Sequence, residues 1–225
     1  MTIEVVNISK AYDGKTVLKD FSMLISDESA YAVTGPDGSG KTTLLKLILG
    51  MIKPDSGQIN LLGDYKYDRV NAGVVFEEDR LCENFSAVEN VAMVNAKLSA
   101  RVAREELEKL LPADVLDLPV RRLSPVMRRK VCIVRACIIP SDVLVLDEPF
   151  VGLDPKAAFT LKQIMHEICA KGTAIFFSTH VLDVAEKLCN KVAIIRQGRI
   201  IAAGTMEELT EGHSLEQTFL EAYHE

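Results

Sequence analysis

The chain has 225 residues, 48% of them hydrophobic and 26% charged, which suits one large α/β domain or a core with a smaller subdomain. Its formal net charge of −6 argues against bulk attraction to nucleic acid, and five scattered cysteines favour a reducing compartment over disulfides. We see neither a signal peptide nor the ~18 consecutive apolar residues that span a bilayer, so any membrane-spanning part is expected from other chains.

Two strands are expected at the N-terminus, over residues 2–8 and 17–25, because apolar residues alternate there with polar ones. Asp13 and Gly14 lie between them and are a strong signal for a hairpin turn. Tyr12 directly precedes this turn. Its ring could stack on a purine, although the local sequence alone favours an ordinary aromatic residue at a strand end.

Residues 35–43 fit Gly-x-x-x-x-Gly-Lys-Thr, the phosphate-binding loop, between a short apolar run and helical material that Gly50 is placed to end. The glycines let backbone N–H groups converge on phosphate oxygens, and the helix N-terminus adds its positive end. Lys41 would reach the β- and γ-phosphates, and the Thr42 hydroxyl would ligate Mg²⁺. The sequence therefore predicts a nucleotide site. Its loop comprises Gly35, Pro36, Asp37, Gly38, Ser39, Gly40, Lys41, Thr42 and Thr43.

The middle of the chain is predicted to be helical. A strand and turn over 58–63 and a short buried strand over 72–76 precede it, and the second strand runs into the acidic stretch 77–79. Apolar residues at helical spacing predict a helix over 88–111. Because residues 82–135 have no strand pattern, we interpret them as a helical insert in an α/β chain.

A further helix is predicted over 126–138. Ser124 is expected to be its N-cap and Pro125 its first residue. Its basic side chains are interpreted either as a solvated face or as partners for the acidic excess of the chain. They are Arg128, Arg129, Lys130 and Arg135.

Residues 143–146 form an apolar run that ends in Asp147 and Glu148 and is interpreted as a central parallel strand. Ligands bind at the carboxyl ends of strands in such sheets. Asp147 can hold Mg²⁺, directly or through water, and Glu148 can orient or deprotonate the attacking water. The alternative is a helix-capping aspartate followed by a first-turn glutamate, which fits less well beside an intact phosphate loop.

A second run of the same form, residues 174–179, ends at His180. A lone histidine is more often structural than catalytic, but its place at a strand end makes His180 a candidate for contacting the γ-phosphate. Beyond it, Gln197 and Gly198 predict a hairpin, and the tail from Ser214 has helical spacing.

These motifs, in this order, resemble those of the ATP-binding cassette ATPases, the motor subunits of ABC transporters, over nearly the whole chain. The resemblance implies an α/β fold: a P-loop NTPase core with a mixed sheet and helices on both faces, an N-terminal antiparallel β subdomain and a helical subdomain. It implies a single ABC ATPase domain over 1–225. Its segments are 1–80 (β subdomain and phosphate loop region), 81–138 (helical subdomain with signature), 139–205 (catalytic core) and 206–225 (C-terminal helical tail).

The resemblance also implies roles for single residues. Tyr12 matches the adenine-stacking aromatic of the family, which reverses the interpretation from local sequence, and His180 matches its switch histidine. Residues 150–154 resemble the loop that crosses the dimer interface. Family members work as head-to-tail dimers, so Ser124 and Asp154 would act across the dimer, with Ser124 reaching ATP held by the opposite subunit.

One departure from the family pattern lies in the signature, typically Leu-Ser-Gly-Gly-Gln, which reads LSPVM over residues 123–127. Val126 puts a branched side chain where a glycine lets phosphate approach the backbone closely. Pro125 removes an N–H that a helix N-terminus could have offered. We therefore predict a weakened contact across the dimer and low ATPase activity in a symmetric homodimer.

A second departure is Glu77, where the family usually has a glutamine that contacts Mg²⁺ and the attacking water. A carboxylate ligates Mg²⁺ at least as well as an amide oxygen, so we interpret this change as tolerated. The implied cofactors are ATP and Mg²⁺. The expected catalytic residues are Glu148, His180 and Lys41, and the expected Mg²⁺ ligands are Thr42, Glu77 and Asp147.

The predicted function is an ATP-binding and hydrolysing subunit of an ABC transporter, in the cytoplasm at the inner face of the cell membrane. Its expected partners are transmembrane permease subunits and a second ABC ATPase subunit, as a homodimer or heterodimer, and no nucleic acid. Export is favoured because segments 179–186 and 214–220 look like those of drug or sodium exporters. Segments 77–81 and 88–91 look instead like those of nitrate- or taurine-type importers.

Two other functions were considered. A regulatory ATP-binding cassette with weak turnover, paired with an active one, would fit the altered signature. A soluble cassette ATPase of translation or DNA repair fits less well, because the sequence shows neither a second cassette nor a long coiled coil.

Overall fold

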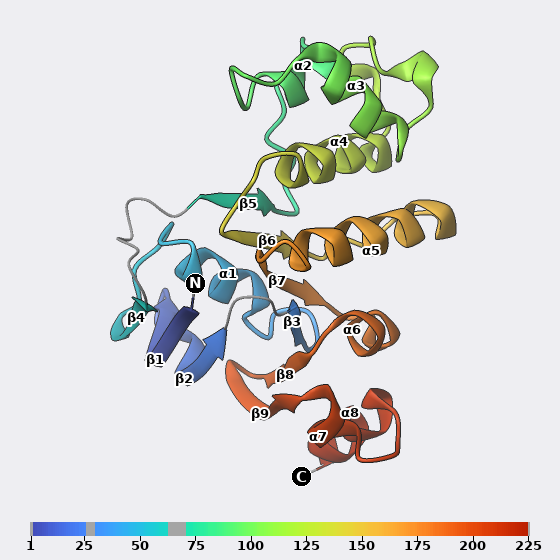
Figure 1. Cartoon of the computed structure of the whole chain (residues 1–225). Coiled ribbons are helices and arrows are strands. Elements are labelled where there is room, and N and C mark those ends of the chain that lie inside the picture. The colour runs from blue at the N-terminus through green and yellow to red at the C-terminus, as the bar shows by residue number, and fades with distance from the viewer. Residues whose placement is uncertain (1, 26–29, 63–70, 225) are drawn as a thin grey trace.

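The computed structural model describes residues 2–25, 30–62 and 71–224 (Figure 1). The described strands are β1 (Thr2–Tyr12), β2 (Lys15–Ile25), β3 (Ala30–Thr34), β4 (Ser56–Leu62), β5 (Ala72–Val75), β6 (Val143–Asp147), β7 (Ala174–Thr179), β8 (Lys191–Arg196) and β9 (Arg199–Thr205). The described helices are α1 (Lys41–Ile48), α2 (Ala87–Ala92), α3 (Ala100–Glu108), α4 (Pro125–Cys137), α5 (Pro155–Cys169), α6 (Leu182–Leu188), α7 (Met206–Thr210) and α8 (Leu215–His224). Two 3₁₀ turns, Ala113–Val115 and Val120–Arg122, precede α4.

The larger sheet has the order β5-β6-β7-β3-β8-β9, parallel except for the antiparallel hairpin of β8 and β9. Side chains that alternate along β6 enter two different cores. Val143 and Val145 pack with the α1 side, whereas Leu144 and Leu146 pack with the cluster that includes Leu161 of α5. Both faces of this sheet are therefore covered, and the predicted mixed sheet with helices on both faces is confirmed.

The smaller sheet, β2-β1-β4, is antiparallel throughout, as predicted for the N-terminal part. Asp13 and Gly14 both have positive φ angles and turn β1 into β2, which confirms the predicted hairpin. Both strands are longer than the alternation suggested. In β1 the pairing register shifts between Val5 and Ile8, where Asn7 has a φ of 46°, so the alternation of apolar residues is interrupted within a continuous strand.

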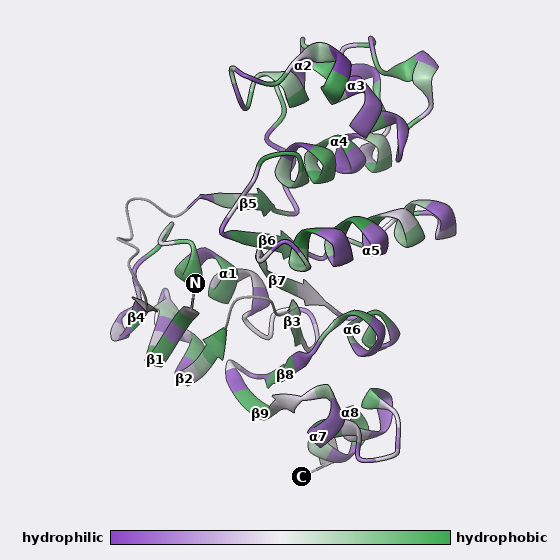
Figure 2. Ribbon diagram, in the orientation of Figure 1, coloured by the Kyte–Doolittle hydropathy of each residue, from purple (hydrophilic) through white to green (hydrophobic). Residues whose placement is uncertain are grey.

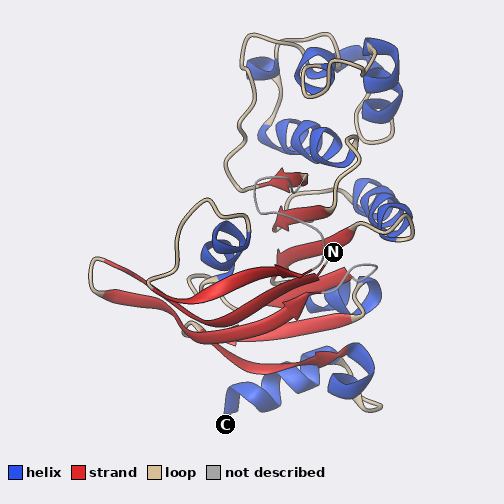
Figure 3. Cartoon of the chain, turned by 60° about the vertical axis from the view of Figure 1, so that its left-hand side comes forward, coloured by secondary structure: helices blue, strands red, loops and turns tan. Residues whose placement is uncertain are grey.

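The helical part lies at one end of the molecule, and the C-terminal helices α7 and α8 lie at the opposite end (Figures 1 and 3). Residues 82–135, all of them described, contain no strand, as predicted. Hydrophilic and hydrophobic residues are mixed along the helices of this part in Figure 2. In α3 only Ala103 and Leu107 are buried.

The prediction of one helix over 88–111 is wrong. Helix α2 ends at Ala92 and α3 begins at Ala100, after a connection in which two polar side chains accept backbone hydrogen bonds. Asn95 Oδ1 accepts a hydrogen bond from Lys97 N at 2.9 Å, and Ser99 Oγ accepts one from Val102 N at 3.3 Å. Such side chains compete with helical hydrogen bonds, so the chain stops and restarts although its apolar spacing continues.

The caps and turns described next lie where the sequence predicts them. Ser124 caps α4 and Pro125 occupies its first turn, as predicted. Gly50 follows α1 with a φ of 65° and donates to Leu47 O, and the β8–β9 hairpin turns at Gln197-Gly198. Among the helices of the described residues, none has the length and apolar character needed to cross a membrane.

Candidate functional site

The predicted phosphate loop lies between β3 and α1, at the carboxyl end of β3. Because β3 pairs with β7 and β7 with β6, the parallel strands that carry the other predicted residues end at the same edge. Gly40 has a φ of 108°, and a Cβ there would lie 2.9 Å from Val17 O. At Gly35 a Cβ would lie 2.2 Å from Ile195 O. Glycine is therefore required at both positions by the packing of the loop.

The side chain of Lys41 is buried and folds back over this loop. Its Nζ donates to Gly35 O at 2.8 Å and to Pro36 O at 3.0 Å, and it lies 3.9 Å from Glu148 Oε1. The buried Ser39 Oγ has no hydrogen-bond partner among the described residues. The loop therefore presents a cation and an unused hydroxyl at the first turn of α1, which suits an anion such as a phosphate group.

Asp147 lies at the end of β6 and is 2% exposed. Thr42 Oγ1 donates to its Oδ2 at 2.7 Å, and Ser178 Oγ donates to its Oδ1 at 2.5 Å. A hydroxyl and a carboxylate oxygen side by side fit Mg²⁺, which is usually bound by one or two carboxylates together with phosphates and water. Glu77 is exposed after β5, and in the described part of the chain it makes no hydrogen bond to Thr42 or Asp147.

Glu148 follows Asp147 in a left-handed conformation, with a φ of 48°. Its N–H donates to Ser178 Oγ at 2.8 Å, and its Oε2 lies 3.0 Å from His180 Nδ1 and accepts from His180 N at 3.3 Å. Its Oε1 is buried and has no hydrogen-bond partner among the described residues. Glu148 thus keeps one carboxylate oxygen oriented by His180 and the other unused, which suits a proton acceptor.

Arg129 belongs to this site although the sequence did not single it out. From α4 its guanidinium donates to three backbone carbonyls: those of Phe76 after β5, Asp147 at the end of β6, and Glu148. Burial lowers the pKa of Arg129 below its usual value, while the nearby carboxylates act in the opposite direction. An arginine remains protonated despite such a shift, so all its N–H groups stay donors.

Two other basic residues of α4, Arg128 and Arg135, bind the segment after β5. Arg128 makes two hydrogen bonds of 2.7 Å to Asp79 and a third to Glu83, and Arg135 Nη1 donates to Arg80 O at 2.7 Å. Acidic side chains are thus the partners of Arg128 and Lys130, as one of the two interpretations proposed, whereas Arg129 and Arg135 bind backbone carbonyls.

Ser124 and Asp154 have their partners in α4 and α5 rather than in the phosphate loop. Ser124 Oγ accepts from Met127 N at 3.3 Å. Asp154 caps α5 by accepting from Ala157 N at 2.9 Å and forms an ion pair of 2.7 Å with Lys130 Nζ. The hydrogen bond from Lys130 lowers the pKa of Asp154 to about 2.

Tyr12 lies at the end of β1 and is 44% exposed. Lys10 Nζ lies 5.6 Å from the centre of its ring. One face of the ring therefore contacts a cation, and the side chain remains accessible.

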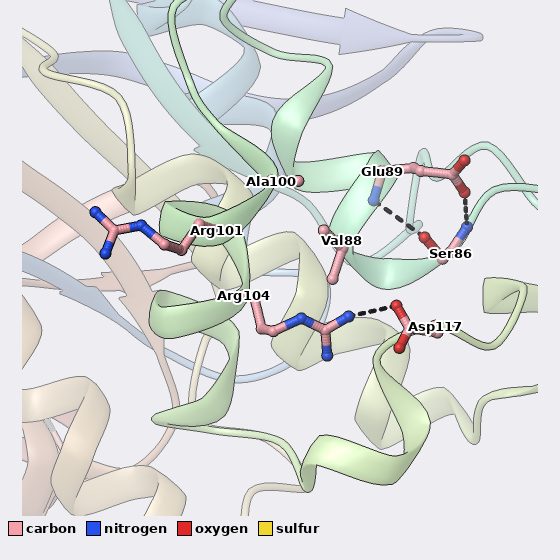
Figure 4. A pocket seen from close by; sticks show the side chains of 7 residues that line it. All are labelled: Ser86, Val88, Glu89, Ala100, Arg101, Arg104 and Asp117. Atoms are coloured by element: carbon pink, nitrogen blue, oxygen red, sulfur yellow. Dashed lines mark hydrogen bonds and ion pairs between the residues drawn. The ribbon is translucent and has the colours of Figure 1, made fainter.

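A hollow of about 510 Å³ lies in the helical part, between α2 and α3 (Figure 4). Arg104 Nη2 reaches across to Asp117 Oδ1, and Ser86 and Glu89 form the capping box that begins α2. The lining residues are Ser86, Val88, Glu89, Ala100, Arg101, Arg104 and Asp117. None of them is among the predicted ATP-site residues, so this hollow is a separate feature.

Comparisons with known proteins extend over nearly the whole chain. A family model described as ABC transporter matches residues 18–151. The Nod factor export ATP-binding protein I of Burkholderia orbicola is 36% identical over 220 residues, which are 93% of this chain and 72% of the relative. The protein of the same name from Rhizobium johnstonii is 32% identical over 94% of this chain and 71% of its own length.

Solved structures of ABC transporter cassettes also match this chain. The structure of an ATP-binding subunit of an ABC transporter, 30% identical, superposes with a TM-score of 0.83 and covers 99% of this chain and all of that one. A dimeric ATP-binding cassette in a post-hydrolysis state with ADP and Pi is 22% identical, with a TM-score of 0.80 over 91% of this chain and 98% of that one. At that identity it shows the fold alone. Nothing in these descriptions supports a regulatory cassette.

Proposed function

Because the chain belongs to the ABC transporter family, as an ATP-binding subunit with ATPase activity, we propose that it powers export through separate membrane subunits. The relatives named export ATP-binding proteins support this direction, together with the exporter-like segments 179–186 and 214–220. We place the chain at the cytoplasmic face of the membrane, because the ATP that it uses is found there.

One observation carries the assignment of the site. The five side chains with proposed roles in phosphate, Mg²⁺ and water chemistry form two sets of contacts between the start of α1 and the carboxyl ends of β6 and β7, and the consecutive residues Asp147 and Glu148 join the two sets. Thr42 and Asp147 are 2.7 Å apart, Lys41 and Glu148 are 3.9 Å apart, and Glu148 and His180 are 3.0 Å apart. A merely structural set of polar residues would not leave the buried Glu148 Oε1 without a hydrogen-bond partner.

We propose the following division of work. Lys41 exchanges its two carbonyl partners for phosphate oxygens, and Glu148 takes a proton from the attacking water at Oε1. His180 holds the other Glu148 oxygen and contacts the γ-phosphate. Thr42 and Asp147 would hold Mg²⁺, which supplies positive charge against the phosphate oxygens.

The remaining residues act around this centre. Tyr12 stacks on adenine through its exposed ring, and Glu77 joins the Mg²⁺ site when the segment after β5 moves inward. Ser124 and Asp154 act in a dimer of cassettes, homo- or heteromeric, in which Ser124 faces the ATP of the partner. The phosphates are cradled by Gly35, Pro36, Asp37, Gly38, Ser39, Gly40, Lys41, Thr42 and Thr43.

The domain division is also part of the proposal. We assign one ABC ATPase domain to the chain, with residues 81–138 as the surface on which the permease subunits bind. The hollow between α2 and α3 lies there, and its paired charges on Arg104 and Asp117 suit a partner segment with polar side chains.

The first test is Mg-ATP turnover of the purified chain against its Glu148→Gln variant. Loss of a general base costs on the order of 10²–10⁴-fold, so we expect turnover to fall by that factor while ATP binding is kept. Glu167→Gln, at an exposed position on α5, is the matched control and should change neither quantity. Full turnover in Glu148→Gln would remove Glu148 from the mechanism.

The direction of transport needs a second test. In inside-out vesicles from cells that make the complete transporter, the cassettes face the medium. ATP added outside should then drive substrate into the lumen, and vesicles with the Glu148→Gln chain should not accumulate it. ATP-driven loss of a preloaded substrate would instead indicate import.

A further inference from the structure

Arg129 joins two strand ends that the main-chain hydrogen bonds of the sheet do not join. Strands β5 and β6 pair in register as far as Val75 and Leu146. The next residues of the two strands, Phe76 and Asp147, are outside this pairing, and their carbonyls both accept from the same Arg129 guanidinium. Helix α4 lies beside β5 in the fold (Figure 1), so Arg129 reaches these carbonyls from a third element.

The same guanidinium also fixes the backbone of Glu148. The left-handed conformation of this non-glycine residue costs on the order of 1–3 kcal/mol and persists only when its surroundings hold it. Its N–H is held by Ser178 Oγ at 2.8 Å, and its C=O is held by Arg129 Nη2 at 3.0 Å. These two bonds direct the Glu148 side chain toward Lys41 and His180.

We propose that Arg129 is a positioning residue for ATP hydrolysis, which holds the Asp147–Glu148 backbone so that the two carboxylates keep their places. The proposal rests on the function assigned to Glu148 above. The hydrogen bonds of Arg129 go to backbone carbonyls, and the charges of Asp147, Glu77 and Glu148 act on it electrostatically. Its planar fork donates from two separate nitrogens, Nη1 to Phe76 O and Nη2 to Asp147 O and Glu148 O, whereas a lysine would donate to all three from a single nitrogen.

Two variants test this role. Arg129→Met removes the donors and keeps an apolar stem of similar length, and Arg129→Lys keeps the charge. A misplacement of about 1 Å at a reacting group can cost on the order of 100-fold, so we expect kcat to fall by roughly that factor in both variants. The KM for ATP should rise far less than kcat falls, because the hydrogen bonds of Arg129 go to the ends of β5 and β6 and not to the phosphate loop or Tyr12.

Arg135→Met is the matched control. Arg135 lies on the same helix and also donates to a backbone carbonyl after β5, that of Arg80, but to neither carbonyl of the catalytic strand end. We expect its kcat to stay at the wild-type value. Thermal unfolding of all variants separates a positioning effect from loss of the fold, and if Arg129→Met does not fold, Arg129→Lys carries the test.

The outcomes are distinct. Equal kcat values for the Arg129 and Arg135 variants would overturn the proposal, as would a kcat in Arg129→Lys equal to that of the wild type. A kcat that falls only in parallel with a raised KM and a lower unfolding temperature would also overturn it. Glu148→Gln, measured alongside, separates failure of the proposed role of Glu148 from failure of the proposed role of Arg129. If Glu148→Gln keeps full turnover, the role assigned to Glu148 fails, whatever the Arg129 variants show.

Discussion

Asp147 and Glu148 are adjacent acidic residues with different surroundings. Both carboxylate oxygens of Asp147 accept hydrogen bonds from hydroxyl groups, and the side chain is almost fully buried. Glu148 has one oxygen near His180 and one without a hydrogen-bond partner. Because the left-handed φ at Glu148 turns the chain between them, the two consecutive residues have surroundings that differ, which suits the two tasks proposed for them, metal binding and proton transfer.

The ion pair of Asp154 with Lys130 gives a prediction for pH. The pKa of Asp154 is lowered from 3.8 to about 2 by the Lys130 hydrogen bond and the Ala157 N–H. A lowered pKa in the folded state contributes stability above pH 3.8, and this stability is lost as the pH falls toward 2. We therefore expect wild type to be more stable than Asp154→Asn near neutral pH, with the difference shrinking through this window.

Thermal unfolding of both proteins over a pH series measures this effect. Asparagine is as good an N-cap as aspartate, so Asp154→Asn removes the charge and keeps the cap of α5. Lys130→Met removes the other partner of the ion pair, so its stability difference from wild type should shrink over the same pH range. A stability difference that does not change with pH would show that the ion pair contributes nothing.

At the level of elements, α4 connects most parts of the proposed mechanism. Its N-terminus carries Ser124 and the altered signature, Arg129 reaches the catalytic strand, and Lys130 holds Asp154. The side chain of Val126 is 37% exposed and lies next to Gly152, where an added Cβ would be 3.5 Å from Val126 Cγ2. The signature region thus presents an apolar side chain at the surface where a glycine is usual in the family.

The altered signature can be tested by restoring both glycines. We expect Pro125→Gly combined with Val126→Gly to raise the turnover of the symmetric homodimer, because it returns an N–H group and removes a branched side chain. Each glycine in the first turn of α4 should also lower stability, by roughly 0.5–1 kcal/mol. Steady-state Mg-ATP turnover and thermal unfolding measure the two effects. If turnover does not rise, the signature residues do not limit this enzyme.

At the scale of the whole molecule, the larger sheet separates two cores and carries the site at one of its edges. Phe176 and Phe177 are fully buried neighbours on β7 that point to opposite faces, one into each core. Phe177 also packs edge-on against Phe150, with 6.1 Å between ring centres, at the start of the proposed interface loop. Strand β7 therefore packs into both cores and also carries Ser178 and leads into His180, two residues of the site.

Removing one of these rings should destabilise the whole fold. We expect Phe177→Ala to lower the free energy of unfolding by about 3–5 kcal/mol, because it leaves a cavity beside β7. Phe159→Ala is the matched control: Phe159 is 62% exposed on α5, so its loss should cost no more than about 0.5 kcal/mol. Denaturant unfolding of both variants checks the difference. Similar losses at the two positions would contradict the burial assigned to Phe177.

The sequence by itself determined the elements with strong local signals. The strand–loop–helix around residues 35–43, the strand that ends in Asp147, the hairpin at Asp13 and the cap at Ser124 were all predicted correctly, because turns, caps and apolar runs depend on neighbouring residues. The same reasoning failed between Ala92 and Ala100. There the apolar spacing continued while polar side chains offered the backbone other hydrogen-bond partners.

Only the tertiary structure decided which distant groups meet. The three carbonyls bound by Arg129 lie 53, 18 and 19 residues away along the chain, and Asp154 lies 24 residues from Lys130. In the sequence the basic residues of α4 were compatible with a solvated face, because a local pattern does not record what packs against a helix. Their partners exist only once β5, β6 and α5 lie around α4, and this arrangement follows from burial of the two cores.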